Sequence, residues 1–248
     1  MKKLLSIILS ISLLLSMSTV SFATESLVGS GGSGYAGDDS LTLEEIKESY
    51  VIARNLPHRD RDAISLMRSY VTVTVNAVCD QEWIDVMSEE GLGGLDDAEF
   101  IIDEISERTE NWVGVHLYGY AVRGTTLNES GAGGQKYVDE AWDEYGKGTR
   151  DLMIAFYGVR PQESGFGGWA YFGLPKSALF LQTYNRTWQV GIHETGHMYN
   201  VKVVGNIDSD CYEECVMNDD MYTNNRYDLI CDDCLDLWIA HKNDYPQN

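Results

Sequence analysis

The sequence predicts an α+β fold, in which a mixed, mostly parallel twisted sheet packs against helices and a small Cys-rich part follows. Segments with strand-like and helix-like hydrophobic periods alternate between residues 40 and 200. This alternation is typical of a sheet covered by helices. Four of the five cysteines lie after residue 205, which distinguishes the last part of the chain from the rest.

The first residues have the features of a secretory signal peptide. Two lysines precede an apolar run at 4–15, and residues 21–23 form a small-x-small cleavage signal. The run is shorter than the roughly 20 apolar residues that a membrane span needs. We therefore expect cleavage of the signal peptide and secretion, without a membrane partner afterwards. The expected division is a signal peptide at 1–23, a flexible Gly/Ser-rich lead-in at 24–39 and one folded domain at 40–248, with an N-terminal helical region at 40–69 and a Cys-rich part at 205–248.

The charge of the chain narrows the classes of partner. The formal net charge is −21, and it becomes two units more negative if Lys2 and Lys3 leave with the signal peptide. Such a surface repels phosphate backbones and anionic lipids, so nucleic-acid binding is not expected. Bound cations and cationic substrates are favoured instead. Calcium is not expected, because no loop has the spacing of an EF-hand.

Hydrophobic period and helix-end signals predict the individual elements. Thr42 and Glu45 have the capping-box spacing and open a helix at 41–55. Val71, Val73 and Val75 alternate with polar residues, which indicates a strand from about residue 70. The other predictions are helices at 62–69, 96–108, 137–145 and 187–200, strands at 112–121, 151–157, 167–173 and 177–184, and a loop at 124–134.

Two of the predicted helices carry an apolar stripe. In the helix at 187–200 the stripe is expected to pack on the sheet, and it consists of Trp188, Ile192 and Tyr199. A C-terminal helix is expected to bury a second stripe, which consists of Leu235, Trp238 and Ile239.

The strongest chemical signal is His193-Glu194-Thr195-Gly196-His197. Histidines four residues apart on a helix lie about 40° apart around its axis, so His193 and His197 can bind one metal ion. Bound zinc would lower the pKa of a water ligand toward about 7, and Glu194 beside it could accept the proton. The H-E-x-x-H pattern therefore predicts a catalytic zinc site.

With the residues that follow, the motif resembles the metzincin metalloproteases, and the archaemetzincins most closely. Metzincins continue with a glycine and a third ligand and later form a turn around a methionine beneath the metal. Met217 in "CYEECVM" matches that Met-turn. The resemblance implies a zincin-like catalytic domain with zinc as its cofactor. It also implies a second zinc held by four thiolates, at positions matched by Cys211, Cys215, Cys231 and Cys234.

The chain departs from the metzincin pattern just after His197. Asn200 stands in the glycine position and Val203 in the position of the third ligand. Gly205 and Asp208 restore the G-x-x-D spacing five residues later, so Asp208 is the first candidate for the third ligand. Asp210 is its rival, because it immediately precedes Cys211. Glu213 and Glu214 are a third, less favoured pair of candidates.

The cysteines after residue 205 have two interpretations. Their C-x3-C and C-x2-C spacings fit a structural zinc, but a secreted protein equally permits two disulfides. The resemblance favours zinc. Cys79 is expected to be a buried structural residue rather than an inhibitory thiolate. His116 and His241 are expected to be ordinary residues and not ligands.

Together these features predict a secreted zinc metallopeptidase that cleaves peptide bonds in a peptide or protein substrate. The resemblance implies that the substrate pairs as an extended strand with an edge strand at 167–173, and that Glu194 is the general base. The alternative is an inactive secreted binding protein that retains a protease fold. Asn200 and Val203 favour this alternative, whereas the presence of Glu194 opposes it.

Overall fold

The computed structural model describes residues 30–31, 42–55, 70–88, 93–201, 215–218 and 229–245. The predicted signal peptide and the helix expected at 62–69 lie outside them. The strands are β1 (Ser30–Gly31), β2 (Val71–Asp80), β3 (Val115–Gly124), β4 (Leu152–Tyr157), β5 (Gly168–Ala170) and β6 (Lys176–Phe180). The helices are α2 (Leu43–Asn55), α3 (Gln81–Ser88), α4 (Leu95–Val113), α5 (Gly134–Glu144), α6 (Pro161–Ser164), α7 (Tyr184–Met198) and α8 (Asp232–His241).

The strands form one mixed sheet in the order β1-β5-β6-β4-β2-β3. The pairs β3 with β2, β2 with β4 and β4 with β6 are parallel. β5 runs antiparallel to β6, and β1 runs antiparallel to β5. The prediction of a mixed, mostly parallel sheet with helices is therefore confirmed.

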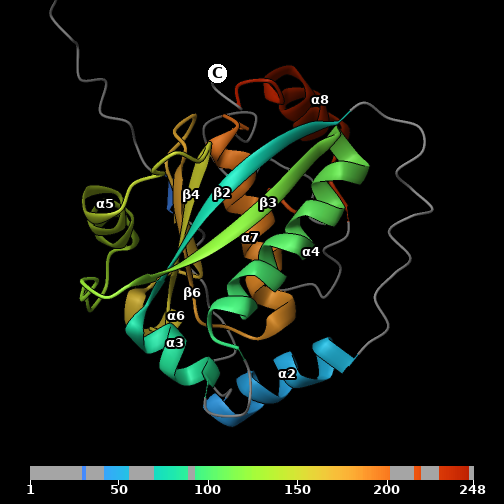
Figure 1. Cartoon of the computed structure of the whole chain (residues 1–248). Helices are drawn as coiled ribbons and strands as arrows, with labels where there is room; N and C mark the ends of the chain where they lie inside the picture. The colour runs from blue at the N-terminus through green and yellow to red at the C-terminus, as the bar shows by residue number, and fades with distance from the viewer. Residues whose placement is uncertain are drawn as a thin grey trace, which may run out of the picture.

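Helices cover both faces of the sheet (Figure 1). α4 and α7 pack against each other and against one face, whereas α5 packs on β4, β5 and β6 from the other. β4 lies between these layers and is buried along its whole length. Leu152, Ile154 and Phe156 join the core on the α7 side, and Met153, Ala155 and Tyr157 join the core on the α5 side. This two-sided burial explains the continuous apolar run of the strand.

Two local sequence patterns near the start of the domain, a capping box and an alternating strand, predicted the structure correctly. The Thr42 backbone N–H donates to a Glu45 carboxylate oxygen at 2.7 Å, and the Glu45 N–H donates to the Thr42 hydroxyl at 3.3 Å. The predicted capping box is therefore present. In β2, Val73 and Val75 are fully buried while Thr72 is exposed, as the alternating pattern predicts.

Several predicted boundaries were wrong. The strand expected from residue 112 begins at Val115, because α4 continues through Val113. Gly114, with a φ of 75°, ends this helix, and its N–H bonds to Thr109 and Glu110 satisfy two of the last carbonyls. The strand expected at 177–184 ends at Phe180, and α7 begins already at Tyr184. α3 was not predicted.

The two expected apolar stripes have contacts that the sequence did not indicate. Tyr199 belongs to the same buried core cluster as residues of β2 and β4, and it also lies against Trp238 and Tyr245, with ring centroids 5.9 and 5.2 Å away. Ile239 is 42% exposed, so the buried stripe of α8 depends on Trp238 instead. The C-terminal residues therefore pack against the end of α7.

The buried carboxyl of Asp80 joins the end of β2 to two neighbouring segments. Its Oδ1 accepts hydrogen bonds from the backbone N–H groups of Trp83 at 2.6 Å and Gly158 at 3.0 Å. Burial raises the pKa of Asp80 to about 6, and these two hydrogen bonds offset only part of the effect. Asp80 is therefore a structural residue whose ionisation opposes folding.

We expect Asp80→Asn to stabilise the protein at pH 7, since an amide oxygen can accept both hydrogen bonds without a buried charge. A raised pKa in the folded state contributes stability below the usual value of 3.8 that is lost as the pH rises through about 6. The stability difference between variant and parent should therefore grow over this window, up to about 3 kcal/mol. Urea unfolding at several pH values measures it. Asp85→Asn, at an exposed position of α3, is the control and should show no such growth.

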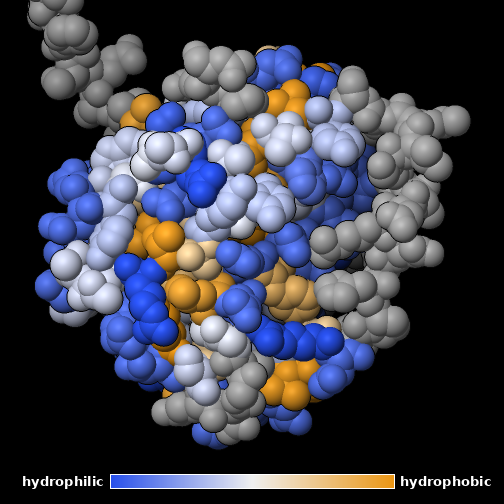
Figure 2. All heavy atoms as spheres, viewed as in Figure 1, coloured by the Kyte–Doolittle hydropathy of each residue, from blue (hydrophilic) through white to orange (hydrophobic). Residues whose placement is uncertain are grey.

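No helix among the described residues is long and apolar enough to cross a membrane. Figure 2 shows that hydrophilic residues cover most of one face of the molecule, with hydrophobic residues between them.

Candidate metal centre

The two histidines of the motif lie in a helix that is enclosed on all sides. Every residue of α7 from Thr187 onward is buried, because the helix packs on α4, β5 and β6. At its N-terminal half, the hydroxyl of Tyr50 in α2 donates to Thr187 Oγ1 at 2.9 Å. His193, Glu194 and His197 therefore project from a backbone with little freedom to move.

The imidazole rings of His193 and His197 face each other. Their Nε2 atoms lie 2.8 Å apart, and the rings are nearly perpendicular. On the opposite side, His193 Nδ1 lies 2.9 Å from the carbonyl oxygen of Val216. His197 Nδ1 lies 3.0 Å from the carbonyl oxygen of Val201. Because a carbonyl oxygen can only accept, each Nδ1 carries the hydrogen in these bonds.

This hydrogen bonding directs two Nε2 lone pairs at one point. Neutral rings with protonated Nδ1 atoms would repel each other at 2.8 Å, and a shared cation would remove that repulsion. Two nitrogens bound tetrahedrally to zinc lie about 3.3 Å apart, so a small adjustment of the rings is sufficient. Metal-binding histidines commonly donate their other N–H to a backbone carbonyl. The residues present therefore fit a bound metal ion.

Glu194 is fully buried between α7 and β5. A Cβ atom built on Gly168 would lie 2.9 Å from Glu194 Oε1 and 2.6 Å from Val190. Only glycine fits this close approach of strand and helix. The carboxylate therefore lies directly against the backbone of β5, one residue from the histidine that precedes it in the motif.

Met217 lies beneath the same helix. A Cβ atom built on Gly196 would lie 2.5 Å from the Met217 sulfur, so the glycine between the histidines admits the methionine. Val216, the preceding residue, accepts the hydrogen bond from His193. The turn at 215–218 thus supports the histidine pair both by packing and by a hydrogen bond.

Three cysteines form a cluster beside this turn. The sulfur atoms of Cys215, Cys231 and Cys234 lie within 4.8 Å of one another and could hold a metal ion. Cys215 Sγ accepts hydrogen bonds from the backbone N–H groups of Met217 at 3.4 Å and Cys231 at 3.3 Å. Cys215, Cys231 and Cys234 are not joined to one another by disulfides. Because Cys215 is adjacent to Val216, the cluster and the histidine pair share one turn of the backbone.

Asn200, in the glycine position of the metzincin pattern, has a φ of 59°. This is the left-handed region, which glycine favours and which asparagine tolerates better than most residues. The Asn200 and Gly173 N–H groups both donate to the carbonyl oxygen of His197, at 2.9 Å each. The chain therefore turns away from α7 although the glycine is absent.

We expect Asn200→Val to destabilise the protein by about 1–3 kcal/mol, because a β-branched residue is strained at this φ. Asn200→Gly should keep the turn and change stability by less than about 1 kcal/mol. Asn55→Val, at an exposed helical position, controls for the change in side chain. Urea unfolding compares the three variants, and equal losses for both valine variants would contradict the conformational explanation.

Several predicted site residues lie outside the described part of the chain. They are both candidates for the third ligand and the less favoured acidic pair, together with the first cysteine of the predicted four: Asp208, Asp210, Glu213, Glu214 and Cys211.

The other histidines and the remaining cysteine lie elsewhere. His241 Nδ1 pairs with Asp244 at 2.8 Å at the end of α8. Cys79 is fully buried in β2, where burial raises the pKa of its thiol. It is not part of the three-cysteine cluster.

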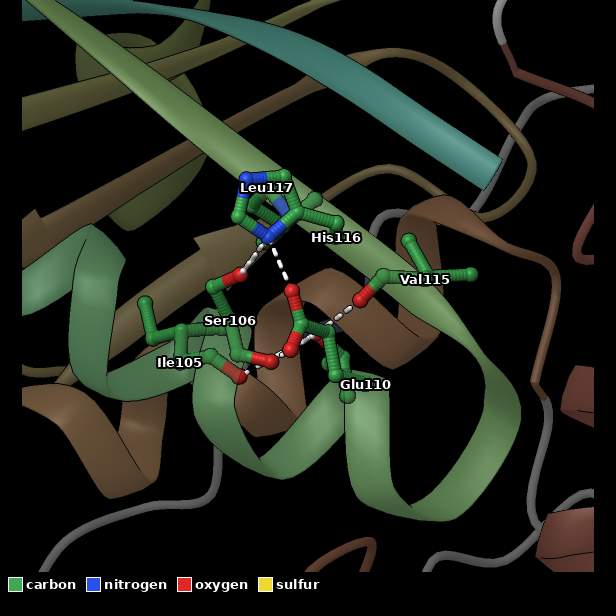
Figure 3. Close-up of polar contacts among 7 residues, drawn as sticks. Ile105, Ser106, Glu110, Val115, His116 and Leu117 are labelled. Carbon is green, nitrogen blue, oxygen red and sulfur yellow. Dashed lines mark hydrogen bonds and ion pairs between the residues drawn. The ribbon is translucent and has the colours of Figure 1, made fainter. Parts of the chain in front are cut away.

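His116 forms a second polar group, shown in Figure 3. Its Nδ1 lies 3.2 Å from the hydroxyl of Ser106 and also contacts the carboxylate of Glu110. A nucleophilic Ser–His–acid triad needs the serine and the acid on different ring nitrogens, whereas here both contact Nδ1. Leu117 N–H donates to the same hydroxyl at 2.9 Å. These contacts connect α4 to β3 and serve the fold.

Sequence reasoning missed the backbone groups that orient the histidines. The carbonyls of Val201 and Val216 leave no signal in residue type, since every residue has one. It also missed Phe172, whose ring packs edge-on against His197 with centroids 4.8 Å apart. The sequence offered one signal for this contact, since Phe172 is an aromatic residue in the strand predicted at 167–173, shortly before the motif.

Comparisons with known proteins do not identify a family. No protein-family model matches the chain, and no curated protein matches its sequence. Among solved structures, a chain described as "Structure of a chaperone-substrate complex" aligns with 14% identity and a TM-score of 0.44. The alignment covers 56% of this chain and 28% of that chain. A likeness at this level establishes neither fold family nor function.

Proposed function

We propose that this protein is a secreted zinc-dependent endopeptidase of the metzincin type, most similar to the archaemetzincins. The observation that carries the proposal is the histidine pair, whose Nε2 atoms converge at 2.8 Å while backbone carbonyls hold both Nδ1 atoms. Such a pair has a clear use as a metal site. As a purely structural element the pair would need a proton between its two Nε2 atoms, and the resulting positive charge would be costly because both rings are fully buried.

His193 and His197 would hold the zinc ion, and Asp208 or Asp210 would supply an oxygen ligand. When bound, zinc would polarise the scissile carbonyl and acidify a water molecule. Glu194 would accept the proton of the attacking water and pass it to the departing amine. Its contact with Gly168 holds the carboxylate beside the strand on which a substrate would lie.

The substrate would lie extended along β5. A peptide that adds to a sheet in this way gains hydrogen bonds from its main chain whatever its sequence. This supports a broad endopeptidase rather than an enzyme for one small molecule. The turn at 215–218 would act as the Met-turn, and the cysteine cluster, completed by Cys211, would hold a structural zinc.

The competing function is an inactive secreted binding protein on the same fold. The conformation of Asn200 weakens it, since the departure from the glycine pattern leaves the turn after α7 intact. The burial of Glu194 beside the histidines also argues against it, because a binding scaffold has no need of a buried carboxylate there.

Cleavage of a peptide library by the purified mature chain tests the proposal. We expect cleavage that a chelator abolishes and added zinc restores, and about two zinc ions per chain by mass spectrometry. Peptides that stay intact with a fully metal-loaded protein would favour the binding protein. A protein that takes up no zinc at all would overturn the metal site itself.

A further inference from the structure

The strand predicted to be the substrate-binding edge is not the edge of the sheet. β5 pairs with β6 on one side, and on the other it pairs with the two residues of β1. Ser30 lies opposite Ala170 and Gly31 lies opposite Trp169, in antiparallel orientation. β1 is the small blue strand in Figure 1, and it comes from the Gly/Ser-rich lead-in.

The backbone directions show which groups of β5 face β1. Tyr171 N–H donates to Lys176 at 3.4 Å, and Gly167 O accepts from Phe180 N–H at 3.1 Å, so both face the β6 side. Since neighbouring residues of a strand point their backbone groups to opposite sides, Gly168 and Ala170 face outward. Ala170 is therefore the residue that exchanges hydrogen bonds with Ser30.

This pairing lies immediately beside the candidate metal centre. Gly168, the residue that contacts Glu194, immediately precedes Trp169 in β5. An extended peptide on β5 near Glu194 needs the same outward-facing backbone groups. β1 and such a peptide cannot occupy this edge at the same time.

We propose that the segment around Ser30 and Gly31 is an internal competitor for peptides that bind to β5, and so restrains the activity of the site. The inference rests on the proposed function only in its choice of a peptide as the displaced ligand. β1 consists of one serine and one glycine, and it pairs with β5 through its main chain. A strand of two residues is weak, which makes the competition reversible.

The strength of the restraint depends on the fraction of molecules in which β1 is paired with β5. The apparent dissociation constant of a peptide is the intrinsic value divided by the fraction of molecules with an open edge. If β1 covers the edge in about nine of ten molecules, its release tightens peptide binding about tenfold.

Two proline variants of the full mature chain test the proposal. Ser30→Pro removes the N–H that faces Ala170, whereas Gly31→Pro removes an N–H that points away from β5. The two proline variants and their parent all carry Glu194→Gln as well. This substitution lets a labelled extended peptide bind without being cleaved. Hydrogen exchange of Ala170 and the peptide dissociation constant are measured for each.

We expect Ser30→Pro to accelerate exchange at Ala170 and to tighten peptide binding by about three- to tenfold, with smaller effects for Gly31→Pro. Unchanged exchange at Ala170, or faster exchange with unchanged peptide affinity, would overturn the proposal. The outcome is separable from that of the proposed function. Tighter binding by a chain that never cleaves peptides would retain the competitor and reject the peptidase.

Discussion

Glu194→Gln should lower kcat/KM for peptide cleavage by about 10²–10⁴-fold, the usual contribution of a general acid–base group. Glutamine has nearly the same shape, so it fits against Gly168 and leaves the histidine pair in place. It cannot accept the proton of the attacking water. We therefore expect unchanged zinc content and an unchanged unfolding midpoint, with the loss almost entirely in kcat.

Glu163→Gln is the matched control. Glu163 lies in α6, pairs with Arg160 at 3.2 Å and is about half exposed, so its substitution should leave cleavage unchanged. Steady-state kinetics with a peptide from the library measures both variants. Activity of Glu194→Gln within one order of magnitude of the parent would reject the assigned role and favour another base.

Cys234→Ser should prevent the cysteine cluster from holding the zinc ion that we propose for it. Serine is a poor substitute for a thiolate, and loss of a ligand should exceed the 10–100-fold loss of affinity that follows from losing a supporting contact. Binding of structural zinc contributes directly to folding. We therefore expect one zinc ion fewer per chain and a lower Tm.

The same variant should also weaken peptide cleavage, although Cys234 lies in α8 and not in the strand proposed to bind the substrate. Cys215 in the cluster is followed by Val216, which orients His193, so a loosened cluster should disturb the histidine pair. Cys79→Ala, in the core of β2, is the control and should retain the metal. If the cysteines instead form disulfides, a reductant will release thiols in the parent chain and the zinc content will not fall in the variant.

Residue types and spacings were sufficient to predict which side chains of α7 form the candidate metal site. His193 and His197 are four residues apart on a helix, so their shared direction follows from helix geometry alone. The capping box at Thr42 and the alternation in β2 are equally local, and both predictions were confirmed. The two-sided burial of β4 was also predictable, because its apolar run is continuous.

Predictions that depended on distant segments were less accurate. The edge of the sheet was assigned to residues 167–173, but β5 is shorter and β1 covers it. A glycine-rich segment has no hydrophobic pattern that would reveal a strand, since its pairing uses only the main chain. The end of α4 was misplaced because the apolar Trp112 and Val113 continue the helix to Gly114, where a left-handed glycine stops it.

The sequence by itself determined the ligand types, their spacing along α7 and the approximate order of strands and helices. Periodicity and motif spacing are properties of residues close together in the sequence, so they can be recognised without knowledge of the fold. Only the tertiary structure decided that the carbonyls of Val201 and Val216 orient the histidines, that three cysteines meet beside Met217 and that Ser30 pairs with Ala170. These contacts join segments far apart in the chain through backbone groups or packing, for which residue identity carries little information.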